Sequence, residues 1–104
     1  MKAYEVISSP EKWTKGTYAR DSSGFPTGSR CSESVCWCAV GALTVAYGYS
    51  LNGVGDAYHE ALFKVEHKLR EMGKGGPHGY ITTFNDHPDT TYEDVYNLLK
   101  ELDV

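Results

Sequence analysis

Residues 34–47 read SVCWCAVGALTVAY and contain no charged side chain. A helix that is apolar on every side has to be covered by other elements of the fold. Ser32 or Ser34 could cap the start of such a helix, and Gly48 directly follows its end. The segment therefore predicts a buried central helix from Ser34 to Tyr47.

This apolar stretch is too short to cross a membrane. Gly41 and Thr44 interrupt it, and a hydrocarbon core of about 30 Å needs roughly 20 predominantly apolar residues in one helix. A secretory signal is not expected either, because Glu5 comes early and no long apolar run with a small-residue cleavage site follows.

Two amphipathic helices are predicted in the second half of the chain. One extends from Asp56 to Met72 and ends at Gly73, and the other begins where Thr90 and Glu93 have the spacing of a capping box. The apolar residues at helical spacing are Tyr58, Leu62, Val65, Leu69 and Met72 in the first, and Val95, Leu98, Leu99 and Leu102 in the second.

A small β-hairpin is predicted near the N-terminus. Residues 17–20 and 25–27 flank the sequence DSSG at 21–24, in which Asp favours the start of a turn and Gly its end. Pro26 has no backbone N–H, so its strand is expected at an edge of the sheet. Residues 80–84 could form a short third strand or an extended run.

Together these elements predict an α+β fold that is mainly α. About three principal helices are expected around a central apolar helix, with the hairpin beside them. A chain of 104 residues with 40% apolar residues is near the usual size of one domain, so residues 1–104 are expected to form a single domain.

The charge of the chain argues against a nucleic-acid partner, and its cysteine content argues against secretion. The chain has 10 basic and 14 acidic residues and a net charge of -4, without a basic cluster, so nucleic acid is not an expected partner. Cys31, Cys36 and Cys38 are an odd number of cysteines crowded together, whereas small secreted domains use even sets spread along the chain. A cytoplasmic location with reduced thiols is therefore expected.

The Cys36-Trp37 pair at the start of the predicted helix is the most suggestive site of chemistry. A thiolate at a helix N-terminus is stabilised by the helix dipole and by free N–H groups. The pair resembles the nucleophile region of papain-like hydrolases, in which case His78 would be the base and Asn85 or Asp86 would orient it. The alternative is that this cysteine and Cys38 are small buried side chains, as free cysteines usually are.

A zinc site is the second possible site of chemistry. Its donors would be the three cysteines with one of the four histidines, His59, His67, His78 or His87. Structural zinc sites normally use two ligand pairs at C-x2-4-C spacing. Cys36 and Cys38 are separated by one residue and would point about 200° apart on a helix, so neither a metal nor another cofactor is predicted.

Four polar residues lie at the ends of the predicted extended segments and could contact a ligand: Arg20, Asp21, Asn85 and Asp86. Two carboxylates could also act as acid and base if they lay close together. The alternative is turn chemistry, because Asp21 begins the hairpin turn and the Asn-Asp pair precedes Pro88.

Tyrosine is frequent in this chain, with eight residues. Five of them could line a surface for a protein partner, because tyrosine gives rigid amphipathic contact area: Tyr47, Tyr49, Tyr58, Tyr92 and Tyr96. They could equally close a small core.

Four blocks of sequence carry a resemblance to a known family. They are SPEKWTKG at 9–16, YARD at 18–21, CWCAVGAL at 36–43 and FND at 84–86. In this order they resemble an uncharacterised family of short bacterial and phage proteins with W-x-x-G, A-R-D, C-x-C-A-x-G-A-L and W/F-N-D blocks. The resemblance implies a bacterial or phage cytosolic origin and no particular reaction, so no functional residue is carried over from it.

The expected function is therefore binding. We expect a small non-enzymatic accessory protein that contacts a macromolecule, such as a protein partner, or a small ligand through aromatic and polar loop residues. The alternative is a thiol-dependent hydrolase or transferase with Cys36 as nucleophile. The sequence does not predict an oligomeric state.

Overall fold

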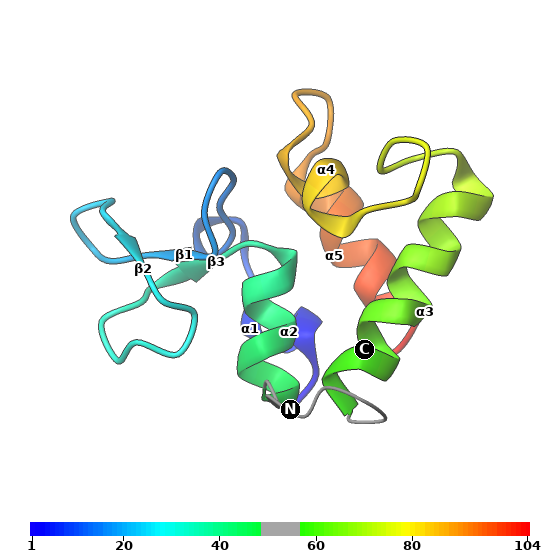
Figure 1. The fold of residues 1–104 in the computed structure, drawn as a ribbon. Helices are drawn as coiled ribbons and strands as arrows, with labels where there is room; N and C mark the ends of the chain where they lie inside the picture. The colour runs from blue at the N-terminus through cyan, green and yellow to red at the C-terminus, as the bar shows by residue number, and fades with distance from the viewer. Residues whose placement is uncertain (49–56) are drawn as a thin grey trace.

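The computed structural model describes residues 1–48 and 57–104, and it confirms the predicted α+β fold. In chain order the elements are α1 (Ala3–Val6), the 3-10 helix η1 (Pro10–Lys12), β1 (Ala19–Arg20), β2 (Pro26–Thr27), β3 (Cys36–Trp37), α2 (Ala39–Tyr47), α3 (Ala57–Met72), α4 (Ile81–Asp86) and α5 (Tyr92–Glu101). In Figure 1 the small sheet lies on one side of the molecule, α3, α4 and α5 lie on the other, and α2 lies between them.

Helix α2 occupies the centre of the fold, as predicted. It packs against α1, α3 and α4, and none of its residues is exposed. Gly41 permits the closest approach, because a Cβ at this position would lie 2.2 Å from the carbonyl oxygen of Tyr18. The apolar core extends from α2 into α1, α3 and α5, and we call these four helices the helical layer.

The predicted start of this helix at Ser34 is wrong, because α2 begins at Ala39. The preceding residues continue the sheet instead: Val35 N donates to Arg20 O at 2.9 Å, and Cys38 N donates to Tyr18 O at 3.0 Å. Cross-strand pairing thus takes the backbone groups that the first helical turn would have used.

The caps proposed for α2 at Ser32 or Ser34 are also wrong. The Ser34 hydroxyl donates to Gly28 O in the loop after the hairpin, and the N-cap is Cys38, whose Sγ accepts from Gly41 N at 3.4 Å. The predicted end is right, because Gly48 is the C-cap with φ 74°.

The predicted hairpin is confirmed. Strand β1 pairs antiparallel with β2, Ala19 opposite Thr27, and also with β3, Ala19 opposite Trp37, which gives the order β2-β1-β3. Asp21 forms the turn, since its Oδ1 accepts from the backbone N of Ser23 and of Phe25. The proline-containing strand lies at an edge, as its missing N–H requires.

Helix α3 is described from Ala57 to Met72, and its predicted start at Asp56 lies outside the described residues. Its buried residues are Tyr58, Ala61, Val65 and Leu69, so the apolar stripe is shifted slightly from the predicted one, and Met72 is 44% exposed. The helix ends as predicted, because Gly73 has φ 70° and the next residue, Lys74, donates to Leu69 O. No helix within the described ranges combines the length and the apolar character needed to cross a membrane.

The strand considered for residues 80–84 is wrong, because Ile81–Asp86 form the helix α4. A carboxylate from the neighbouring helix stabilises its first turn, since Glu66 Oε2 accepts from Ile81 N at 3.1 Å. The third strand is Cys36–Trp37 instead.

Helix α5 was predicted correctly, but its cap is one residue later than expected. Thr91 is the N-cap and forms a capping box with Asp94, not Thr90 with Glu93. The predicted apolar face is right for Val95, Leu98 and Leu99, which are buried.

The described tyrosines of the proposed partner surface belong to the core or its edge. Tyr58 is 7% exposed, the Tyr47 hydroxyl donates to Val104 O, and the Tyr92 hydroxyl donates to Ile7 O. Tyr96 is half-buried and its ring stacks on that of Tyr92, while Tyr49 lies outside the described residues.

Candidate functional site

Asn85 lies near the end of α4 and its side chain is 1% exposed. Its Oδ1 accepts hydrogen bonds from Trp13 Nε1 at 2.7 Å and from Ala39 N at 3.0 Å. Its Nδ2 donates to Thr14 O at 3.1 Å and to Asp86 Oδ1 at 3.0 Å. Both donors and both acceptor positions of the amide are therefore used.

This single amide connects three segments that are distant in sequence. Trp13 and Thr14 follow η1, Ala39 begins α2, and Asn85 belongs to α4. The hydrogen bond to Ala39 N satisfies a first-turn donor that has no partner within its own helix. We call these four residues the polar junction.

Asp86 is the exposed neighbour of the buried Asn85. Its Oδ1 accepts from Gly16 N and from Asn85 Nδ2, both at 3.0 Å, and no described residue forms a hydrogen bond or an ion pair with its Oδ2. Two hydrogen bonds to one oxygen hold the carboxylate in a defined orientation, and the second oxygen is left available.

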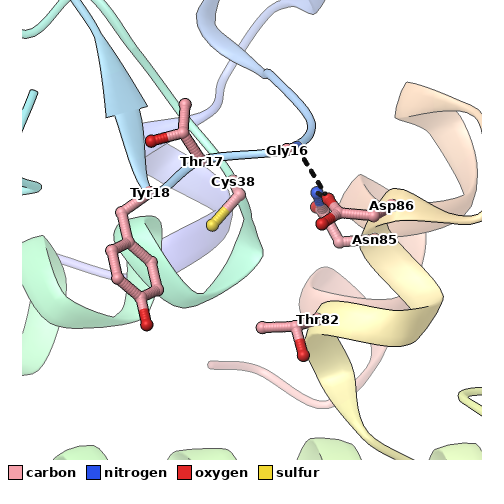
Figure 2. Close-up of a pocket in the computed structure, with 7 residues that line it drawn as sticks. All are labelled: Gly16, Thr17, Tyr18, Cys38, Thr82, Asn85 and Asp86. Atoms are coloured by element: carbon pink, nitrogen blue, oxygen red, sulfur yellow. Dashed lines mark hydrogen bonds between the residues drawn. The ribbon is translucent and has the colours of Figure 1, made fainter. Parts of the chain in front are cut away.

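A pocket of ≈ 330 Å³ lies beside the polar junction, and we call it the junction pocket. It is lined by Gly16, Thr17, Tyr18, Cys38, Thr82, Asn85 and Asp86. Figure 2 shows the ring of Tyr18 and the sulfur of Cys38 on one side, with the side chains of α4 on the other. Its volume is near the lower end of the range of about 300–1,000 Å³ in which proteins bind small molecules.

The thiol in this pocket belongs to Cys38, which is 4% exposed. Burial raises the pKa of the Cys38 thiol above its ordinary value, and the nearby Asp86 charge acts in the same direction. Hydrogen bonds from the backbone of Gly41 and Val40 lower the pKa but do not outweigh the burial. The thiol is therefore protonated at neutral pH.

Comparison with protein families identifies the family of the chain. A family model described as "Family of unknown function (DUF6197)" matches residues 1–102. The chain belongs to this family. No curated protein and no solved structure matches the chain.

Because the family description names no activity, the site itself has to indicate the chemistry of this DUF6197 protein. The lining residues come from the four sequence blocks at 9–16, 18–21, 36–43 and 84–86, and only Thr17 and Thr82 fall outside those blocks. The polar junction and the junction pocket are thus the place where the four blocks meet in space.

The residues of the hypothetical thiol site lie in different places. Cys36 is half-buried on β3, opposite Arg20 of β1. His78 is exposed in the connector after α3, where its ring lies 5.3 Å from the ring of Tyr80. Neither residue lines the junction pocket, whereas Asn85 does.

The four polar residues proposed for ligand binding divide into two pairs. Asn85 and Asp86 line the junction pocket. Arg20 instead holds the segment beside the pocket, because its guanidinium donates to Thr14 Oγ1 at 2.9 Å, Lys15 O at 3.1 Å and Gly24 O at 3.0 Å.

The carboxylate of Asp21 is used by the hairpin turn, as the turn alternative predicted. No group of three or more potential metal ligands among histidine, cysteine, aspartate and glutamate occurs in the described part of the chain.

Sequence reasoning did not single out several pocket residues. Tyr18, Thr82 and the backbone of Gly16 have no individual signature, and Cys38 was treated as secondary to Cys36. The signal that could have found most of them is the set of four blocks, because three of these residues, Gly16, Tyr18 and Cys38, lie within blocks quoted above.

Proposed function

We propose that this protein is a small binding module whose ligand occupies the junction pocket. The observation that supports this most is the oriented carboxylate of Asp86, which has one oxygen free of described partners at the wall of a 330 Å³ pocket. Polar groups held in place before a ligand arrives reduce the ordering cost of binding.

The chemistry of the pocket favours recognition over covalent catalysis. A cysteine nucleophile needs an accessible thiol with a lowered pKa. Cys38 has the opposite properties, since it is buried and its pKa is raised. Cys36, the nucleophile of the alternative hypothesis, does not line the pocket.

We also propose a cytoplasmic location in a bacterial or phage-infected cell. All three cysteines are free thiols, which is usual in a reducing compartment. The bacterial or phage origin is supported by the resemblance of the four sequence blocks.

A fragment screen monitored by amide resonances tests the binding function. Ligands of the junction pocket should shift the backbone resonances of Gly16, Thr17 and Thr82 in a saturable way. Thr82 is exposed on α4 and lines the pocket, so the variant Thr82→Phe should fill it and abolish these shifts.

The matched control is Thr83→Phe, an exposed position on the same helix that does not line the junction pocket. Its ligand binding should equal that of the original protein. For a macromolecular ligand, the same two variants are compared in a pull-down. Binding that survives in Thr82→Phe, or a screen in which no fragment shifts the pocket resonances, would refute the proposal.

A further inference from the structure

The junction pocket has an uneven charge distribution. Asp86 is the one charged side chain among its lining residues. Across the pocket lies the ring of Tyr18, which is 56% exposed (Figure 2). An aromatic face attracts positive charge.

The basic residues near the pocket have other partners. Lys15 Nζ donates to His87 O at 2.6 Å and lies 5.4 Å from the centre of the Trp13 ring. The guanidinium of Arg20 donates three hydrogen bonds, to Thr14, Lys15 and Gly24. No described lysine or arginine forms an ion pair with Asp86.

We propose that the junction pocket binds a primary ammonium group, held between the carboxylate of Asp86 and the ring of Tyr18. This inference rests on the proposed binding function and specifies its ligand. The ammonium donates a charge-assisted hydrogen bond to Asp86 Oδ2. The net charge of -4 also favours the approach of a cation.

A primary ammonium fits this pocket better than a quaternary one. Quaternary ammonium groups cannot donate hydrogen bonds, and proteins recognise them through cages of several aromatic rings. Tyr18 is the one aromatic residue that lines this pocket among the described residues. The oriented carboxylate is instead suited to accept a charge-assisted hydrogen bond.

Three sources carry this group: a lysine side chain, the amino terminus of a peptide, and a free small amine. The proposal concerns their shared chemistry. N-acetyl-lysine methylamide, glycinamide and ethylammonium represent the three sources, and their relative affinities identify which is preferred.

The test is an amide-resonance titration of the full chain at constant ionic strength. Ethylammonium chloride should shift the resonances of Gly16, Thr82 and Asp86 saturably, whereas tetramethylammonium chloride, ethanol and sodium acetate should not. Asp86→Asn preserves an oxygen for Gly16 N but replaces the free oxygen by a donor, so we expect at least a tenfold loss of affinity, roughly what a charge-assisted hydrogen bond contributes.

The control is Asp89→Asn, which makes the same change at an exposed carboxylate that does not line the junction pocket. Its affinity for ethylammonium should be unchanged. An unaltered amide spectrum outside the pocket verifies that Asp86→Asn is folded, and Tyr18→Ala, which removes only the ring, gives a second measurement with an expected loss of about two- to fivefold.

Equal shifts with tetramethylammonium, or equal affinity of Asp86→Asn and the original protein, would overturn the ammonium proposal. If neutral or anionic fragments bind in the junction pocket while the amines do not, the ligand class is wrong but the binding function stands. If neither fragments nor amines shift the pocket resonances, both proposals fail.

Discussion

In the helical layer, Leu43, Leu69 and Leu99 are fully buried among apolar neighbours, whereas at the polar junction the fully buried side chain is the amide of Asn85. Apolar contacts are not directional, so several side chains of similar volume could fill the helical layer. The junction depends on one residue type, because only an amide presents two donors and two acceptors in this geometry. The helical layer therefore provides bulk stability, and the junction connects the segment after η1 with α2 and α4.

The largest expected effect comes from Asn85→Ala. This change leaves Trp13 Nε1 and Ala39 N without their shared acceptor, and each unsatisfied buried group costs about 1–3 kcal/mol. We expect the free energy of unfolding to fall by about 4 kcal/mol, measured by urea denaturation. Leu99→Ala in the helical layer is the reference, with an expected loss of about 3 kcal/mol.

Asn85→Ala and Leu99→Ala should also differ in their effect on ligand binding. Asn85→Ala should remove binding at the junction pocket, whereas Leu99→Ala should retain it while the chain remains folded. A loss below about 1 kcal/mol for Asn85→Ala would mean that the amide network is not important for stability, and the contrast between the two regions would fail.

Gly41→Ala tests the contact between α2 and the sheet and should have the next largest effect. The added Cβ would lie 2.2 Å from Tyr18 O, a backbone atom, so the helix and strand would have to move apart. We expect a loss of about 3 kcal/mol in thermal or urea unfolding. Gly28→Ala is the control, because a Cβ there meets nothing within 4 Å, and its effect should be within about 0.5 kcal/mol.

The smallest expected effect is a pH dependence from Cys38. Its folded pKa is raised from an ordinary value of 9.0, so above that pH the unfolded state loses the proton before the folded state does. The stabilisation is complete below pH 9 and declines as the pH rises toward the folded pKa, by at most about 1.4 kcal/mol per pH unit. Urea unfolding between pH 8 and 10 measures it.

Cys38→Ala is the matched variant, because it removes the titrating group and should flatten this decline. Tyr47 and Tyr92 also have raised pKa values because of burial, but their ordinary value of 10.0 places their contribution at higher pH. An identical decline in both proteins between pH 9 and 10 would exclude Cys38 as its source.

Elements whose signals are local could be predicted from the sequence. The hairpin follows from an Asp-to-Gly turn, α3 from its periodicity and its terminal Gly73, and α5 from its apolar face. Even the one-residue error in the cap of α5 is understandable, because Thr90 and Thr91 are followed by Glu93 and Asp94 at the same spacing.

Elements that depend on contacts with distant residues could not be predicted from the sequence. Cys36–Trp37 form a strand because β1 lies alongside, and a two-residue strand has no periodicity to detect. Ile81–Asp86 contain β-branched residues that favour a strand, but Glu66 of α3 stabilises the first turn of a helix. Tertiary contacts thus overrode local preference at both positions.

The candidate site was predicted only in part for the same reason. Asn85 and Asp86 were recognised as polar residues near a turn, but the partners of Asn85 at Trp13 and Ala39 are 72 and 46 positions away. A single sequence gives no signal of such pairings. The choice between Cys36 and Cys38 depended on where α2 begins, which the strand pairing determines.

The positions of the two tryptophans have a practical consequence for spectroscopy. The indole of Trp13 donates to Asn85, and the indole of Trp37 donates to Ser29 O at 2.9 Å; the chain has no other tryptophan. Intrinsic tryptophan fluorescence therefore reports on the polar junction and on the sheet, while circular dichroism at 222 nm reports mainly on the helices. If the two signals change at the same denaturant concentration, the protein unfolds as one cooperative unit; an earlier midpoint for fluorescence would show that the polar junction and the sheet separate while the helices persist.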